Sequence, residues 1–275
     1  SSAASDVYKR QHSPPPFTER FAAKGAKDAG KPFVVTHHCD LELKGFFGNT
    51  VVDFYQKYLG DYPLREANRV ISTTDSYATT SRTLWDIDVT VIPNAVDINR
   101  FNIHTDGKII RDKYSCENEP LGLFVGRLVP HKGIGILIRS LTYTKKGKLL
   151  IVGDGPYKKW LISLVKKLDL KDRVIFVGPV DDYWLPSYYS ATDAVILPST
   201  SRLEAFGIVG LEGMASGKPL ILGINKSDKL SQYDKSNLTR SINKKLAFIS
   251  GISIHYISAK QNKGTAKVFK ELVSS

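Results

Sequence analysis

Residues 121–156 read LGLFVGRLVPHKGIGILIRSLTYTKKGKLLIVGDGP, and this stretch decides the fold. Two apolar runs, at 121–125 and 149–152, have the length and composition of buried strands. An amphipathic segment at 133–141 lies between them and is typical of a helix. A strand, a helix and a second strand in this order predict a parallel βαβ unit, because parallel strands need a crossover connection.

The same alternation extends in both directions along the chain. Further candidate strands lie at 33–36, 70–73, 89–92, 174–177, 194–197 and 220–222, and further candidate helices at 17–29, 49–59, 77–84, 157–168 and 207–216. This pattern predicts a doubly wound α/β architecture whose parallel sheets are buried on both faces. In such sheets ligands bind beyond the carboxyl ends of the strands.

Composition indicates a globular protein. The chain has 275 residues, 42% of them apolar, and a net charge of +12. It contains no apolar run of transmembrane length and no signal-peptide core, and its two cysteines, Cys39 and Cys116, show no metal-ligand spacing. We therefore expect a reducing, cytoplasmic setting. Residues 223–275 carry ten basic and three acidic side chains; these are scattered among polar residues, which favours a solvated surface over nucleic-acid binding.

Both ends of the chain differ from its middle. The opening SSAASDVYKRQ, residues 1–11, has no periodicity and resembles a translated sequencing adapter, so we exclude it from the fold as a non-native leader. The prolines of HSPPP, residues 12–16, exclude a helix there. We expect an incomplete first domain at 12–115, an incomplete second domain at 116–221 and a separate tail at 222–275.

Charged residues follow the strand at 121–125. Gly126 turns the chain, and Arg127 and Lys132 are the cations best placed to meet the negative charge of a diphosphate. The tight turn GDGP, 153–156, follows the next strand. The alternative for the two cations is an ordinary solvated loop. Because these exits and the one after 194–197 follow in order, we favour one shared site.

The third exit leads into EAFGIVGLE, residues 204–212. A helix that begins here offers the amides of Gly207, Ile208 and Val209 to a phosphate. Glu204 and Glu212 would accept hydrogen bonds from sugar hydroxyls. Alternatively, Glu204 caps the helix, Glu212 lies on a solvated face and the glycines ease packing.

The segment VVTHHCD, residues 34–40, places histidines after a strand of the first domain. His37, His38 and Asp40 follow directly on its last apolar residues. A single histidine is more often a loop or core residue than a catalyst. Two histidines at a strand exit favour a functional role.

In order, GRLVPHKG, LLIVGDGP, RVIFVG and EAFGIVGLE resemble the donor-domain motifs of retaining family-4 glycosyltransferases with the GT-B fold. VIPNAVDINRF, residues 91–101, resembles the family's passage between two Rossmann-like domains. The resemblance covers about residues 12–221. It implies that a sugar passes, with retention of configuration, from a UDP- or GDP-sugar to a glycan or lipid-linked acceptor. It also implies a cytoplasmic or membrane-peripheral enzyme without a metal or other cofactor.

The resemblance also assigns roles to individual residues. Gly126, Arg127 and Lys132 would hold the donor diphosphate together with the amides of Gly207, Ile208 and Val209. Glu204 would stabilise positive charge at the anomeric carbon, and Glu212 would bind the ribose hydroxyls. Val180 would meet the nucleobase through its backbone. His38 would approach the reacting sugar, so that His38 and Glu204 form the catalytic pair.

The tail, residues 222–275, resembles the end of the second GTPase domain of the Der family. Asn225, Lys226 and Asp228 form its NKSD motif and Ser258, Ala259 and Lys260 its SAK motif, which in that family bind guanine. An ordinary polar turn is the alternative for NKSD. The chain has no GxxxxGK[ST] phosphate loop, so GTP would bind only if the tail is functional, and hydrolysis is not expected. The change of motif near 217–222 suggests a chimera of two parents, and a product without function is a further alternative.

Overall fold

The computed structural model describes residues 8–13, 18–41, 48–55, 58, 60–116, 119–200, 207–219, 221–224, 227–245, 253–258, 261 and 264. The chain forms two compact units, one built on residues 1–95 and the other on residues 96–200 and 207–275. The first unit thus ends at residue 95, whereas we expected residue 115. The intervening segment belongs to the second unit because Phe101 and Ile110 are buried in that unit's core.

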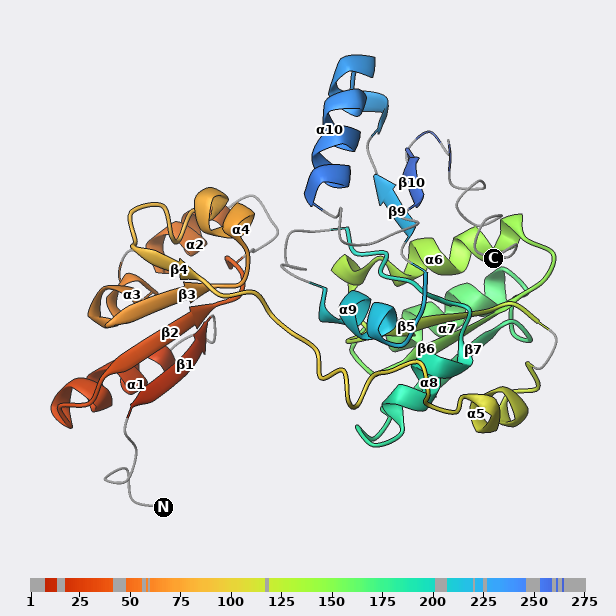
Figure 1. The fold of residues 1–275 in the computed structure, drawn as a ribbon, viewed down its shortest axis with the longest axis horizontal. Helices are drawn as coiled ribbons and strands as arrows, with labels where there is room; N and C mark the ends of the chain where they lie inside the picture. Colours follow the sequence, from red (N-terminus) through yellow and green to blue (C-terminus); the bar gives the residue numbers. More distant parts are fainter. Residues whose placement is uncertain are drawn as a thin grey trace. The chain divides into compact units, whose positions relative to one another are not determined.

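The first unit contains a four-stranded parallel sheet with strand order β1-β2-β3-β4 (Figure 1). Its strands are β1 (Lys9–Ser13), β2 (Phe33–His37), β3 (Arg69–Ser72) and β4 (Val89–Val91). Its helices are α1 (Thr18–Asp28), α2 (Gly48–Tyr55), α3 (Asp61–Glu66) and α4 (Asp75–Thr80). The core lies where α1 and α3 cover the sheet, and it includes Ala23, Ala26, Phe33, Val35 and Leu64.

Strand β1 corrects one expectation from the sequence. Lys9, Arg10 and Gln11 belong to the segment that we excluded from the fold, yet they pair in parallel with Phe33, Val34 and Val35. Backbone hydrogen bonds need no apolar pattern, so the polar sequence KRQHS gave no strand signal. Side-chain hydrogen bonds also cross this pair, from Arg10 Nε to Thr36 Oγ1 at 3.1 Å and between Ser13 Oγ and His37 Nδ1 at 3.2 Å.

The second unit contains a four-stranded parallel sheet with strand order β7-β6-β5-β8. Its strands are β5 (Leu121–Val125), β6 (Lys148–Val152), β7 (Val174–Gly178) and β8 (Ala194–Val195). Its helices are α5 (Lys108–Lys113), α6 (Ile134–Ser140), α7 (Lys158–Lys167), α8 (Leu185–Ala191) and α9 (Ile208–Ala215), with short 3₁₀ turns η3 (Pro130–Lys132) and η4 (Leu141–Tyr143). The predicted parallel α/β architecture is confirmed.

Alternate residues of β5 and β6 point to opposite faces of this sheet and enter two separate cores. Phe124 and Ile151 pack with α6 and α7 on one face. Leu123 and Leu150 pack with α5 and α8 on the other. Both faces of the sheet are therefore covered, as the continuous apolar runs predict.

The order of strands reverses beside β5. The chain adds β6 and β7 on one side of β5 and then returns to place β8 on its other side. Neighbouring strands then lead their connections to opposite faces of the sheet, and ligands of doubly wound sheets bind beyond the carboxyl ends of the strands at such a point. The exits of β5 and β8 lie at this point.

The tail forms a parallel pair of strands, β9 (Ile221–Ile224) and β10 (Ser253–Tyr256), with α10 (Gln232–Lys245) and the turn η5 (Ser227–Lys229). Within the described residues β9 pairs only with β10, in a sheet of its own. The backbone groups of β9 thus find their partners in the tail itself.

Candidate functional site

The loop after β5 is held by backbone contacts with the loop after β6. The Gly126 amide donates to the Val152 carbonyl at 3.0 Å, and the Leu128 amide donates to the Asp154 carbonyl at 2.9 Å. Gly153 has a φ of 122°, and a Cβ there would lie 2.1 Å from the Gly126 carbonyl oxygen. Only glycine allows the two loops this separation.

The loop after β8 contacts the same region. The Thr200 amide and hydroxyl both donate to the His131 carbonyl, at 2.8 and 3.1 Å. A Cβ on Gly133, which has a left-handed φ of 70° and precedes α6, would lie 2.0 Å from the Pro198 carbonyl oxygen. The exits of β5, β6 and β8 therefore meet on one edge of the sheet, as we predicted from the order of the motifs.

Helix α9 begins directly after Gly207, which has a φ of 73° and no side-chain cap. A Cβ on Gly207 would lie 2.7 Å from Leu197 Cδ2, so the helix start packs against the β8 exit. The first amides of a helix have no partner within it, and those of Ile208 and Val209 occupy these positions. The structure thus places a helix N-terminus beside the switch point, where an anion is stabilised.

The two predicted cations lie on the loop that joins β5 to α6. Arg127 is exposed, and Lys132 is half-buried in η3. The Lys132 side chain turns back along the loop, with Cε 4.0 Å from the Cβ position of Gly126. This loop therefore presents positive charge next to the glycine turn.

Glu212 lies in α9 and accepts a hydrogen bond from the hydroxyl group of Tyr189 in α8. Tyr189 is fully buried and packs edge-on against Phe101. Burial, and then the bond to Glu212, raise the pKa of Tyr189 above its ordinary value. Glu212 is thus held by a buried partner rather than lying on a solvated face. We missed Tyr189 because no helix was predicted at 185–191.

Two further predicted residues have different outcomes. Val180 follows β7 and packs, partly buried, against the core that contains Tyr188 and Tyr189. Glu204 lies outside the described residues, so its catalytic role stays a prediction.

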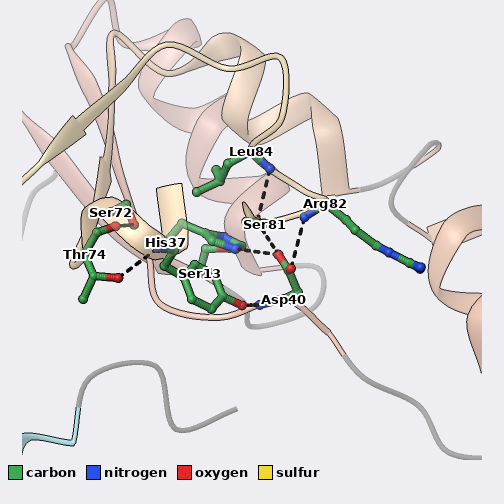
Figure 2. Close-up of polar contacts among 9 residues, drawn as sticks. Ser13, His37, Asp40, Ser72, Thr74, Ser81, Arg82 and Leu84 are labelled. Carbon is green, nitrogen blue, oxygen red and sulfur yellow. Dashed lines mark hydrogen bonds and ion pairs between the residues drawn. The ribbon is translucent and has the colours of Figure 1, made fainter. Parts of the chain in front are cut away.

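The first unit gathers titratable side chains where β1 and β2 end (Figure 2). His37 is buried; its Nδ1 lies 3.2 Å from Ser13 Oγ and its Nε2 lies 3.3 Å from Asp40 Oδ1. Asp40 also accepts from Ser81 Oγ at 2.5 Å and from the Arg82 amide at 3.2 Å. Burial by itself would raise the pKa of Asp40, but hydrogen bonds from His37, Ser81 and Thr83 hold it well below its ordinary value.

His38 lies half-buried beside this group. Its ring is parallel to that of His12, with His12 Nδ1 2.7 Å from His38 Nε2 and ring centroids 5.1 Å apart. Burial, followed by electrostatic interaction with His12, His37 and Arg10, lowers the pKa of His38 below its ordinary value. At neutral pH His38 is therefore an uncharged ring that exchanges a hydrogen bond with His12.

The tail brings one residue of each guanine-binding motif together. Ser258 Oγ donates to Asp228 Oδ1 at 2.5 Å, and the Ser227 amide donates to the Ile257 carbonyl at 3.0 Å. The remaining predicted residues, Asn225, Lys226, Ala259 and Lys260, lie outside the described residues. The structure thus brings Asp228 and Ser258 together, and their role in guanine binding stays a prediction.

Two kinds of feature are absent from the described part of the chain. No group of three or more His, Cys, Asp or Glu side chains there is arranged to hold a metal ion. No helix among the same residues has the length and apolar character needed to cross a membrane.

Comparison with known proteins agrees with this geometry. The model of the family "Glycosyl transferases group 1" matches residues 106–227. This range contains all three strand exits described above and the start of α9. It continues six residues past the point at which we expected the resemblance to end.

Two curated relatives extend the comparison. The chain is 32% identical over 142 residues to GDP-mannose-dependent alpha-(1-6)-phosphatidylinositol monomannoside mannosyltransferase of Mycolicibacterium smegmatis, which covers 48% of this chain and 37% of the relative. It is 30% identical over 197 residues to D-rhamnosyltransferase WbpZ of Pseudomonas aeruginosa, covering 70% of this chain and 49% of the relative. The chain thus spans less than half the length of these relatives.

A solved structure shares the fold. Anabaena Alr3699/HepE, determined in complex with UDP and glucose, aligns with a TM-score of 0.68 at 21% identity, covering 97% of this chain and 70% of that one. Residues 106–227 thus match the model of the group 1 glycosyltransferases, and the chain shares its fold with this solved structure.

Proposed function

We propose that the chain transfers a sugar from a UDP- or GDP-sugar to a hydroxyl group of a glycan or lipid-linked acceptor, with retention of anomeric configuration. One observation carries the proposal: the exits of β5, β6 and β8 are in direct contact where the strand order reverses. Nucleotides bind at such points in doubly wound sheets. The family match over residues 106–227 supports the same assignment.

The donor diphosphate binds at this edge. Arg127 and Lys132 neutralise its charge, and the amides of Gly207, Ile208 and Val209 donate to its oxygens. When the nucleoside diphosphate leaves, these fixed donors stabilise the negative charge that it carries away. The glycine turn at Gly126 lets the phosphates approach the backbone closely.

The remaining residues orient the sugars and the base. Glu212 accepts hydrogen bonds from the ribose hydroxyls through the carboxylate oxygen that Tyr189 leaves open. Val180 meets the nucleobase through its backbone. Glu204 stabilises the positive charge that develops at the anomeric carbon, and His38 approaches the reacting sugar. The acceptor hydroxyl attacks from the face that the diphosphate leaves, which retains the configuration. The enzyme acts in the cytoplasm, in peripheral contact with a membrane when the acceptor is a lipid.

Thermal-shift titration with UDP-glucose and GDP-mannose tests the donor site. A ligand present at about 100 times its Kd stabilises the folded chain by about 2.7 kcal/mol. We expect this stabilisation for the wild type and its loss in Lys132→Ala and Glu212→Ala. Lys171→Ala is the matched control for Lys132, because this exposed lysine precedes β7 (Val174–Gly178) and so lies at the amino end of the same sheet. Equal shifts in Lys132→Ala and Lys171→Ala would contradict the proposal.

The tail carries a second candidate function, guanine-nucleotide binding, which the bond between Ser258 and Asp228 favours. Asp228 would pair with guanine N1 and N2 through its carboxylate group. We expect GDP binding to survive Lys132→Ala and to be lost in Asp228→Ala if the tail binds guanine. The reverse result assigns GDP binding to the donor site. The related hypothesis that residues 222–275 come from a second parent fails if one uninterrupted genomic reading frame encodes the whole chain.

A further inference from the structure

The inference concerns Glu19, which lies in the first turn of α1 and is only 4% exposed. One carboxyl oxygen, Oε1, has no hydrogen-bond partner, and the carboxyl group bonds to the side chain of Ser13. Ser13 also contacts His37, which in turn contacts Asp40. Four side chains thus follow one another in a series of hydrogen bonds, which we call the Glu19 line: Glu19, Ser13, His37 and Asp40.

The Asp40 end of this line is fixed as an acceptor. Asp40 receives hydrogen bonds from Ser81 Oγ and from the Arg82 amide, and these bonds favour the ionised carboxylate. A carboxylate only accepts, so His37 Nε2 must carry the hydrogen that points to Asp40 Oδ1. The tautomer of His37 is therefore set by its neighbour.

The hydrogen position on His37 also sets the direction of the hydrogen bonds from Ser13 to Glu19. A neutral His37 with hydrogen on Nε2 accepts at Nδ1, so the Ser13 hydroxyl donates to it. With His37 neutral, the Ser13 oxygen accepts from Glu19, which is then a protonated carboxylic acid; with Ser13 donating to a Glu19 carboxylate instead, the bond lowers the pKa of Glu19. The unpartnered Oε1 agrees with the protonated form, because a buried charged oxygen without a donor is more costly than a neutral one. Burial raises the pKa of Glu19 to about 7.

In the alternative arrangement the proton lies elsewhere, but the number of protons that Glu19 and His37 share is the same. If Glu19 gives its proton to Ser13 as Ser13 gives its own to His37, a carboxylate and an imidazolium result. Glu19 and His37 together hold one proton in either arrangement. Removing that proton leaves the line short of one donor.

The adjoining cavity excludes a direct role in substrate binding. It is lined by Ser13, Glu19, His37 and Thr83 together with apolar side chains, and its free space of about 10 Å³ matches a single water molecule. A sugar is far larger than this. The cluster therefore acts on its surroundings through hydrogen bonds.

Ser13 connects the line to His38. The Ser13 carbonyl accepts from the His38 amide at 3.0 Å, and Ser13 lies opposite His37 in the parallel pairing of β1 and β2. His12, next to Ser13, contacts the His38 ring at 2.7 Å. Any movement of Ser13 thus displaces both the backbone and the ring partner of His38.

We propose that Glu19 is a positioning residue for His38: its carboxyl group completes a one-proton hydrogen-bond line through Ser13 and His37 to Asp40. This line holds together the ends of β1 and β2 that carry His12 and His38. Its importance for sugar transfer rests on the proposed function of His38. Among the described residues, the other titratable side chains near the cluster are Arg10, His12, Tyr55 and Tyr77, whereas Arg82 contacts it through its backbone amide.

Histidine-ring NMR of the full chain between about pH 5 and pH 9 tests the proposal. In the wild type we expect the ring resonances of His37 and His38 to shift together in a step near pH 7. Glu19→Gln can donate but cannot ionise, so it should abolish the step and keep the hydrogen on His37 Nε2. Glu19→Ala removes the donor and should give a mixture of His37 tautomers.

Glu66→Gln is the matched control, because Glu66 in α3 pairs with exposed Lys27 and its substitution should leave the step in place. If Glu19→Ala does not fold, Ser13→Ala replaces it, with loss of coupling between His37 and His38 as the expected result. Identical ring shifts at every pH in wild type and Glu19→Gln would overturn the proposal. No substrate is needed, so a normal step in a chain that fails to bind any nucleotide sugar would refute the proposed function alone.

Discussion

Within each unit the loops that leave the strands contact one another. These contacts are made by backbone atoms in the second unit and by side chains in the first. In the second unit the backbone of Gly153 packs closely against that of Gly126, and the backbone of Gly133 packs closely against that of Pro198. In the first unit, side chains join the exits of β1 and β2 through Ser13 and His37. Glycines and backbone amides thus join the strand exits of the second unit, and titratable side chains join those of the first unit.

Because of this difference, the stability of the two units should depend on different changes. Glycine contacts leave cations and helix amides available for an anion, and the geometry of these contacts does not change with pH. A hydrogen-bonded line of titratable groups changes when a proton is gained or lost. We therefore expect the second unit to respond most to added side-chain atoms and the first unit to respond most to pH.

The largest effect should follow Gly153→Ala in the second unit. The new Cβ would lie 2.1 Å from the Gly126 carbonyl oxygen, so the two loops must separate. We expect the free energy of unfolding to fall by at least about 3 kcal/mol, as measured by urea denaturation. Gly178→Ala is the control, because Gly178 also has a positive φ of 85° but meets nothing within 4 Å. It should cost only about 1–2 kcal/mol of backbone strain. Equal losses of unfolding free energy in the two variants would show that the contact between the two loops does not contribute to stability.

The next effect concerns pH and the first unit. The pKa of Glu19 is raised from 4.5 to about 7, so the native state holds this proton more tightly than the unfolded state does. Stability from this group is thus complete below about pH 4.5 and is lost as pH rises through 7, by up to about 3 kcal/mol. Glu19→Gln should match the wild type near pH 4.5 and exceed it near pH 8.5 in urea denaturation. A wild-type advantage at the higher pH would refute this assignment.

A smaller effect is expected at the Glu212 support. Tyr189→Phe removes the hydroxyl that donates to Glu212 and should lower the free energy of unfolding by about 1–2 kcal/mol. It should also weaken binding of nucleotide sugar in calorimetric titration, because Glu212 loses its fixed orientation. Tyr188→Phe is the control, since Tyr188 contacts Tyr114 instead. Binding that is weakened equally by both substitutions would argue against a role for the Tyr189 hydroxyl.

The smallest effect is expected in α1, at a glycine that belongs to neither group of strand exits. Gly25 is exposed, and a Cβ there meets nothing within 4 Å. Gly25→Ala should raise the thermal midpoint through a gain of up to about 1 kcal/mol in helix propensity. Gly30→Ala, where φ is 60°, should lower the midpoint although its surroundings are equally open. A gain at both positions would mean that backbone strain is unimportant in this unit.

The sequence predicted those elements whose apolar residues follow a regular pattern. Leu121–Val125 was located to the residue because both of its faces are buried. Strand β1 and helix α8 were missed for opposite reasons. Residues 9–13 are polar and form a strand through backbone pairing alone. Residues 185–191, LPSYYSA, bury tyrosines whose hydroxyls need partners that a sequence does not show.

The candidate site was predictable where its chemistry lies in the backbone. The order of the glycine turns indicated one shared edge, because strand exits of a parallel sheet meet there. The Glu19 line was not predictable, since Glu19 reads as an ordinary acidic residue in the first turn of a helix. Its burial arises only when α1 packs beside β2, which no local pattern reveals.

The most direct measurement is a map of backbone amide shifts by NMR as UDP and GDP are added to the full chain. The account predicts that the largest shifts occur at Arg127 and at Gly207, Ile208 and Val209, with none at Lys171 at the opposite end of the sheet. Shifts that avoid the α9 start, or that gather at the amino ends of the strands, would contradict it.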